Sequence, residues 1–175
     1  MKSFLDLPEE LILKVLSYTE TTDVLRCGQV SKKIRTISND DSLFQTVILM
    51  DKYVKTDLLA VVFNKGCKSL NLTNCSIWGN LSLIQNSKLI KLDLTNCKGT
   101  TYNVLEELVA SSHSLQNLSL EGLLITQKMV VGICQNEQTL QGLTFYNSDF
   151  KLVSREEIGK LENLMILHCC VNGKW

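Results

Sequence analysis

The stretch LTNC occupies residues 72–75 and returns unchanged at residues 94–97, 22 positions later. Two hypotheses explain the return. Either the two cysteines form a pair for a metal ion or a disulfide, or each copy is one unit of a structural repeat. Because the two hypotheses predict different functions, the residues that flank the two copies must decide between them.

The flanking residues extend LTNC into a longer frame, Leu-x-x-Leu-x-Leu-x-x-Asn/Cys. Five copies begin at residues 67, 89, 115, 140 and 164, so that successive starts are 22, 26, 25 and 24 residues apart. A degenerate copy, Phe44-x-x-Val47-x-Leu49, lies 23 residues before the first. This array favours the structural repeat. We therefore interpret the cysteine of LTNC as a small buried residue whose place at the turn helps to satisfy loop amides.

The frame resembles the leucine-rich repeat, in the cysteine-bearing form that is common in F-box proteins. Its Leu-x-Leu core has a period of two, which turns both leucines to one side of a short strand. One such strand buries too little apolar surface alone, so successive strands must stack into a parallel sheet with crossovers on the outer side. Helical patterns lie between the strands at residues 56–66, 102–112 and 126–135, and a capping box opens another at Ser154.

The predicted fold class is therefore α/β. We expect a short leucine-rich-repeat solenoid with parallel strands on the concave face and helices on the convex face. The repeats fill residues 47–175, number about five to six, and have a C-terminal cap that is missing or minimal. Three alternatives remain open for that end: Trp175 folds over it, the chain is part of a longer array, or a partner covers it.

Residues 1–46 do not fit the repeat and predict a separate domain of three helices. Asp6 and Glu9 predict a capping box for the first helix, with Pro8 in its first turn. On a helical wheel, two apolar groups lie about 100° apart: Leu7, Leu11, Val15 and Tyr18 in one, and Ile12 and Leu16 in the other. Either this helix is buried between the other helices and the array, or its second apolar face binds another protein.

Three stretches of this domain together resemble an F-box over about residues 4–47: LPEELILKVLSY at 7–18, DVLRCGQVSKKIR at 23–35 and DDSLFQTV at 40–47. The sequence departs from the family pattern at Thr19, Ile34 and Phe44, which lowers the affinity that we expect for the adaptor. In the family, this motif docks on the Skp adaptor, which joins a cullin. Carried over by position, the resemblance implies an adaptor-binding set of Leu7, Pro8, Ile12, Val15, Leu16, Leu25, Val30, Ser31 and Ile34.

The resemblance implies that the chain is the substrate-recognition subunit of a Skp-cullin-F-box ubiquitin ligase, whose repeats hold the protein to be ubiquitinated. Such a subunit is not itself an enzyme. The alternative is a repeat-based interaction scaffold, or a competitor that occupies the adaptor without delivering a substrate. The expected partners are the Skp adaptor, a cullin through it, and a protein substrate.

The exposed neighbours of the repeat leucines predict where a substrate would bind. With the leucines turned inward, polar side chains line the concave face, and the alternative is a solvated sheet face that binds nothing. Ser69, Gly142 and Ile166 flank the predicted face. The substrate-binding candidates are Asn71, Lys91, Asp93, Asn117, Ser119, Glu121, Thr144, Tyr146 and His168.

Composition and motif spacing argue against other functions. Lys+Arg and Asp+Glu balance at 18 each, so we expect no nucleic-acid or membrane partner. No apolar run approaches a membrane span or a signal peptide, which predicts a cytoplasmic or nuclear protein. The seven cysteines include no Cys-x-x-Cys pair, and no catalytic constellation or phosphate loop is present, so we expect no metal, no cofactor and no catalytic residue.

Overall fold

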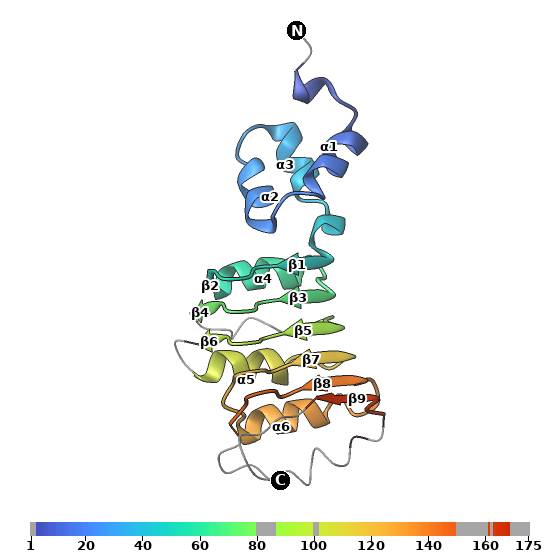
Figure 1. The fold of residues 1–175 in the computed structure, drawn as a ribbon. Coiled ribbons are helices and arrows are strands. Elements are labelled where there is room, and N and C mark those ends of the chain that lie inside the picture. The colour runs from blue at the N-terminus through green and yellow to red at the C-terminus, as the bar shows by residue number, and fades with distance from the viewer. Residues whose placement is uncertain (1–2, 80–86, 100–101, 150–160, 162, 169–175) are drawn as a thin grey trace.

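The computed structural model describes residues 3–79, 87–99, 102–149, 161 and 163–168. Figure 1 shows a cluster of short helices at the N-terminal end, followed by a ladder of strands with helices behind it. The predicted α/β class and the parallel arrangement of the strands are confirmed. The assignment of this array to the leucine-rich repeats stays a prediction.

The first described residues, 3–45, form what we call the helical head. Helix α3 contacts both α1 and α2, and a core forms where the three meet. Its buried residues include Ile12 and Leu16 of α1, Val24 of α2 and Ile34 of α3. The elements of the head are η1 (Phe4–Asp6), α1 (Glu9–Leu16), α2 (Thr21–Cys27), α3 (Lys32–Ser38) and η2 (Asp41–Phe44).

The predicted capping box of the first helix is wrong. Asp6 belongs to η1, where its Oδ2 accepts a hydrogen bond from the Ser3 amide at 2.7 Å, and Ser3 closes that capping box. Helix α1 begins instead after Pro8, which is its N-cap and makes no side-chain cap hydrogen bond. Asp6 does belong to a capping box, but its partner is Ser3 and not Glu9, and the box starts a separate turn because the extended Leu7–Pro8 segment interrupts the helical path.

In the described part of the chain, the main sheet has six parallel strands in the order β1-β3-β5-β7-β8-β9. The register pairs Val47 with Leu70, Leu70 with Leu92, and so on through Leu118 and Leu143. The corresponding positions of the aligned sequence frame are therefore neighbours in the sheet. The strands are β1 (Thr46–Ile48), β3 (Ser69–Asn71), β5 (Lys91–Asp93), β7 (Asn117–Ser119), β8 (Gly142–Thr144) and β9 (Ile166–His168).

The leucines of the frame face the interior, as the period of two requires. Leu72, Leu94 and Leu120 have no exposed surface, and the central leucines of β3 to β8 are at most 2% exposed. Leu167 of β9, the last strand described, is 48% exposed. Burying a leucine stabilises the fold by about 1.5–3 kcal/mol, so the aligned leucines supply much of the apolar core.

A second parallel sheet, absent from the sequence prediction, follows the turns of the first. Its order is β2-β4-β6, and it lies at the side of the strand ladder in Figure 1. Val54 and Ile77 turn inward, whereas Tyr53 and Trp78 turn outward. The strands are β2 (Tyr53–Lys55), β4 (Ser76–Trp78) and β6 (Lys98–Gly99).

Three helices lie behind the strands: α4 (Thr56–Asn64), α5 (Tyr102–Ala110) and α6 (Gln127–Cys134). All three fall within the ranges that the helical patterns predicted. Thr126 caps α6 by accepting a hydrogen bond from the Met129 amide at 3.3 Å. The helix predicted from Ser154 lies outside the described residues. None of the described helices has the length and apolar character that crossing a bilayer requires.

The LTNC stretch is explained residue by residue. Its leucine is buried, and its asparagine adopts a left-handed backbone, with φ of 58° at Asn74 and 53° at Asn96. Asparagine and glycine tolerate this conformation better than other residues. The Cys97 thiol donates to the Leu72 carbonyl at 2.8 Å, and the Cys75 thiol donates to the Leu49 carbonyl. The cysteine therefore bonds a carbonyl of the preceding turn, and the backbone of Lys52 and of Cys75 also hydrogen-bonds the thiols of Cys75 and Cys97, respectively.

Candidate interaction surfaces

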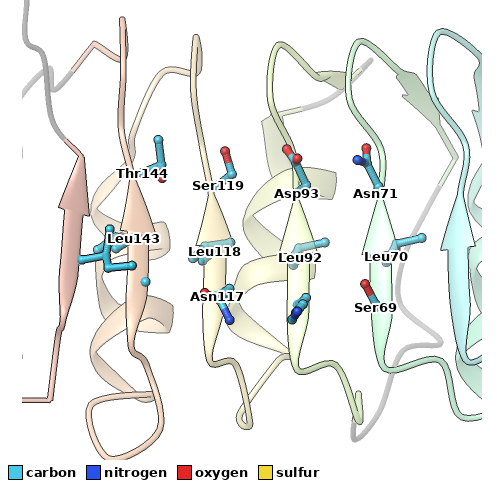
Figure 2. Close-up of a pocket in the computed structure, with 13 residues that line it drawn as sticks. Ser69, Leu70, Asn71, Leu92, Asp93, Asn117, Leu118, Ser119, Leu143 and Thr144 are labelled. Carbon is cyan, nitrogen blue, oxygen red and sulfur yellow. The ribbon is translucent and has the colours of Figure 1, made fainter.

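The exposed side chains of the main sheet form a continuous polar surface, which we call the polar face. The register aligns Ser69, Lys91, Asn117 and Gly142 in one row across the strands. A second row aligns Asn71, Asp93, Ser119 and Thr144. Figure 2 shows the second row at one end of the strands and Ser69 and Asn117 at the other, with the leucines between them.

The polar face is hollowed, with a cavity volume of about 410 Å³. Its middle is formed by the central leucines of β3, β5, β7 and β8, which are buried against the helices on their far side. Because these leucine side chains are at most 2% exposed, a bound segment would meet mainly the polar groups on either side of them, which can orient it. The hollow is lined by Ser69, Leu70, Asn71, Lys91, Leu92, Asp93, Asn117, Leu118, Ser119, Gly142, Leu143, Thr144 and Ile166.

Some side chains of the polar face form hydrogen bonds with the turns that follow their strands. Asn71 Oδ1 accepts from the Thr73 amide and Asp93 Oδ1 from the Thr95 amide, both at 2.9 Å. The Ser119 hydroxyl pairs with that of Thr95, also at 2.9 Å. Among the ion pairs of the described residues, none involves Lys91, whose side chain is exposed. Lys91 is therefore the charged group of this face with most freedom to meet a ligand.

The structure brings most of the predicted substrate-binding set together. Asn71, Lys91, Asp93, Asn117, Ser119 and Thr144 all line the hollow. Glu121 and Tyr146 lie past the ends of β7 and β8, in the turns, and Tyr146 is 46% exposed. His168 ends β9 and pairs with Thr144, but its side chain lies outside what the structure describes. The flanking positions Ser69, Gly142 and Ile166 line the hollow as well.

The predicted adaptor-binding set divides between the surface and the interior of the head. Val15 and Val30 are 46% and 75% exposed, and Pro8 is exposed as well. Leu7 and Leu25 are half-buried against the core. The remaining polar member, Ser31, caps α3 by accepting from the Ile34 amide at 3.2 Å. The interior members, which contribute to the core, are Ile12, Leu16 and Ile34.

The two apolar faces of α1 therefore differ in burial. Ile12 and Leu16 are buried, at 0% and 3% exposure, whereas Leu11, Val15 and Tyr18 are 52%, 46% and 77% exposed. We call the last three the apolar stripe. The helical wheel had separated these two groups without deciding which one faces solvent. Packing against α3 decides it, because only one side of α1 meets that helix. The wheel had also placed Leu7 with the exposed group. That placement is wrong, because Leu7 lies before α1, in extended backbone, and is half-buried against the core.

The segment before α1 is held to the head by one lysine. Lys33 Nζ donates to the Leu5 carbonyl at 2.7 Å and to the Leu7 carbonyl at 2.8 Å. A cation that satisfies two carbonyls at the end of a short helix also complements the partial negative charge there. Phe4 and Leu5, which sequence reasoning had not selected, are thereby held next to Pro8 with 46% and 38% of their surface exposed.

Residues 4–50 match the family model of the F-box-like domain. The chain carries an F-box-like domain. The match spans the whole helical head and extends through β1 to residue 50. It indicates an adaptor-binding role in complexes of the Skp-cullin-F-box type. Two positions at which the sequence departs from the family pattern, Ile34 and Phe44, are buried in the core. Thr19 donates its hydroxyl to the Leu16 carbonyl at 2.8 Å.

The F-box-like domain is tied to the strand array by two lysines from the array. Lys65 Nζ donates to the Asn39 carbonyl at 2.5 Å and to Asp41 Oδ1 at 3.2 Å, and it lies 5.0 Å from the centre of the Phe44 ring. Lys52 pairs with Glu20 of the head. The Gln45 carbonyl also accepts from the amides of Lys68 and Ser69, both at 3.0 Å. These bonds hold the two regions together in addition to the covalent connection between them.

Cys67, Cys75 and Cys97 are buried packing residues. Burial raises the pKa of the Cys97 thiol to about 12 and that of Cys67 to about 11, and it also raises the pKa of Cys75. A thiol with a raised pKa stays protonated at neutral pH and is a poor nucleophile or metal ligand. Within the described residues, no group of three His, Cys, Asp or Glu side chains is placed to hold a metal ion. Cys169 and Cys170 lie outside the described residues.

Proposed function

We propose that the chain is a non-catalytic substrate-recognition subunit of a Skp-cullin-F-box ubiquitin ligase. F-box domains generally bind the Skp adaptor and, through it, a cullin complex. The observation that carries the proposal is the apolar stripe, exposed on α1 and just past its end within the F-box-like domain. Burying each of its large side chains against a partner contributes on the order of 1.5–3 kcal/mol, which suits an adaptor interface.

In this proposal the strand array is a set of leucine-rich repeats, and its polar face binds the target protein. The in-register leucines, the repeated left-handed turn and the helices behind the strands support that assignment. Lys91 and Asp93 give the polar face charges of both signs, which favours selectivity over affinity. The chain would act in the cytoplasm, the nucleus or both.

The second candidate function is a competitor that occupies the adaptor without delivering a target. The shape of the polar face favours this candidate, because a hollow of about 410 Å³ offers a small anchoring volume for a protein ligand. Stable protein interfaces bury about 1,200–2,000 Å² in total, so a target would also have to contact the rim.

Co-expression with the Skp adaptor tests the adaptor-binding half of the proposal. We expect the chain to co-purify with the adaptor at concentrations at which an established F-box protein does. Failure to co-purify, with the chain folded by circular dichroism, would reject the proposal.

Reconstituted ubiquitin transfer tests the other half. Proteins captured by the purified complex are supplied with the cullin, the ubiquitin-conjugating enzyme and ubiquitin. A substrate receptor promotes transfer to at least one captured protein, and Lys91→Glu reduces it. A competitor instead lowers transfer by another F-box protein when it is added in excess.

A further inference from the structure

The outward face of the second sheet carries large aromatic side chains that the fold does not use. Tyr53 is 87% exposed and Trp78 is 43% exposed, while Val54 and Ile77 between them in the strands are buried. Exposed tyrosine and tryptophan are uncommon on surfaces that meet only water, and they are enriched at the centres of protein interfaces. We call this surface, formed by Tyr53, Lys55, Ser76, Trp78 and Lys98, the aromatic face.

The aromatic face has a hollow that is large enough to receive an apolar side chain of a ligand. The register places Ser76 between Tyr53 and Lys98, and it pairs Trp78 with Lys55. Ser76 and Gly99 are small, so the space between the two aromatic rings and Lys98 stays open. The resulting cavity has a volume of about 580 Å³ and is lined by Tyr53, Ser76, Trp78, Lys98 and Gly99.

The charge of the aromatic face has one sign. Lys55 Nζ lies 4.6 Å from the centre of the Trp78 ring, and Lys98 is exposed at the rim of the hollow. None of the ion pairs among the described residues involves either lysine, and β2, β4 and β6 contain no Asp or Glu. The acidic residues next along the chain are Asp51, whose Oδ1 accepts from Asn74 Nδ2, and Asp57 at the start of α4.

We propose that the aromatic face binds an acidic polypeptide segment that carries one large apolar side chain. That side chain lies over Ser76 and Gly99, between the rings of Tyr53 and Trp78. Carboxylates on either side of it meet Lys55 and Lys98, so the charges of ligand and surface are complementary. The proposal is independent of the proposed function, because the adaptor-binding head and the polar face are formed by other elements.

A fluorescence titration tests the proposal directly, because the chain contains two tryptophans, Trp78 and Trp175. In the full chain carrying Trp175→Phe, emission therefore reports on Trp78 alone. The probe is the capped peptide Glu-Asp-Leu-Asp-Glu, and its controls are Gln-Asn-Leu-Asn-Gln, which lacks the charges, and Glu-Asp-Ser-Asp-Glu, which lacks the apolar side chain. We expect a saturable change in Trp78 emission with the first peptide and at least fivefold weaker binding of both controls.

Two variants and a matched control locate the binding. Lys98→Glu reverses one charge of the aromatic face, and we expect it to weaken binding about tenfold. Tyr53→Ser removes one wall of the hollow and is expected to weaken it to a similar degree. Lys88→Glu makes the same charge change at an exposed site outside this face and should leave affinity within about twofold of the parent chain.

Three results would overturn the proposal. The first is no saturable change in Trp78 emission at millimolar peptide. The second is an equal loss of affinity in Lys88→Glu and Lys98→Glu, which would show attraction to net charge alone. The third is a Trp78 ring that acrylamide fails to quench in the free chain, which would show that the hollow is already covered. Thermal melting of each variant confirms that it is folded.

Discussion

Leu11 and Val15 of helix α1, with Tyr18 just past its end, are exposed on one side, whereas strands β3, β5, β7 and β8 each bury a central leucine beside a polar neighbour. Both patterns place apolar residues at the spacing of their secondary structure. In the array, every aligned leucine meets a neighbouring strand or a helix behind it. In the head, α1 packs against α3 through Ile12 and Leu16, and its second apolar side stays exposed.

This difference suits two regions that bind different kinds of partner. The apolar stripe suits an obligatory partner of fixed identity, since apolar contacts give affinity with little selectivity. The polar face suits recognition, because each hydroxyl, amide or charge must find a matching group. Lys52 and Lys65 join the two regions, so a ligand on one is held in a defined position relative to a ligand on the other.

The largest expected effect comes from removing a buried leucine of the array. Leu94→Ala leaves a cavity in a close-packed core and should lower the free energy of unfolding by about 2–5 kcal/mol. Leu11→Ala on the apolar stripe, where the side chain is 52% exposed, should change it by less than about 0.5 kcal/mol. Urea denaturation measures both. Equal losses would erase the contrast between the two regions.

A smaller loss of stability is expected from removing one of the buried thiols that bond a carbonyl of the preceding turn. Cys97→Ala removes the thiol donor of the buried Leu72 carbonyl, which keeps its bond from the Cys75 amide, and should lower the free energy of unfolding by about 0.5–1.5 kcal/mol. Cys97→Ser is the matched control, since Ser148 holds the equivalent place and donates to the Leu120 carbonyl at 2.7 Å. We expect the serine variant to lie closer to the parent chain. The same denaturation series would contradict the bonding role if the alanine variant were the more stable of the two.

The buried thiols also predict how stability depends on pH. Burial raises the pKa of Cys97 to about 12 in the folded chain, above its ordinary value of 9.0. Below pH 9 the Cys97 thiol is protonated in both the folded and the unfolded chain, and its contribution to the free energy of unfolding is fully present. As the pH rises toward 12 this contribution is lost, because the thiol then releases its proton only in the unfolded chain. The slope is about 1.4 kcal/mol per pH unit at most. The parent chain should therefore lose more stability between pH 8 and 10 than Cys97→Ser does, and parallel curves would refute this.

The smallest effect is expected where the two regions meet. Lys65→Met keeps the apolar stem against Phe44 but removes the bonds to Asn39 and Asp41, which should cost about 1 kcal/mol or less because Asp41 is 70% exposed. Arg26→Met, which breaks an exposed ion pair within α2, should cost almost nothing. A thermal melt compares the two. Equal melting temperatures of the two variants would mean that Lys65 contributes nothing to the stability of the junction between the two regions.

Sequence reasoning predicted the main sheet because its signal is periodic and redundant. Each Leu-x-Leu core marks a strand, and successive copies fix both the order and the register. It missed the second sheet because β2, β4 and β6 are two or three residues long and their side chains vary, from Tyr-Val-Lys to Ser-Ile-Trp. The apolar-inward alternation of Val54 and Ile77 was a signal, but one too short to distinguish from a loop.

The sequence predicted which side chains share a face where backbone geometry alone decides it, as for Asn71, Asp93 and Ser119 on the polar face, whose binding role stays a prediction. It was less successful in the head. There, Ile12, Leu16 and Ile34 were transferred by position from the family pattern, yet tertiary packing places them in the core. A helical wheel shows which residues share a side, but only the position of the neighbouring helix shows which side is free.

If the chain acts as we propose, the apolar stripe, and not the array, binds the adaptor. The most direct measurement is retention of the Skp adaptor by the double variant Leu11→Asp/Val15→Asp, compared with Val61→Asp/Val131→Asp on the exposed surfaces of α4 and α6. The account predicts at least about a tenfold loss of affinity for the head variant, since two carboxylates would be buried unpaired. It predicts unchanged retention for the α4/α6 variant. Retention of the adaptor by the head variant at the level of the parent chain would contradict it.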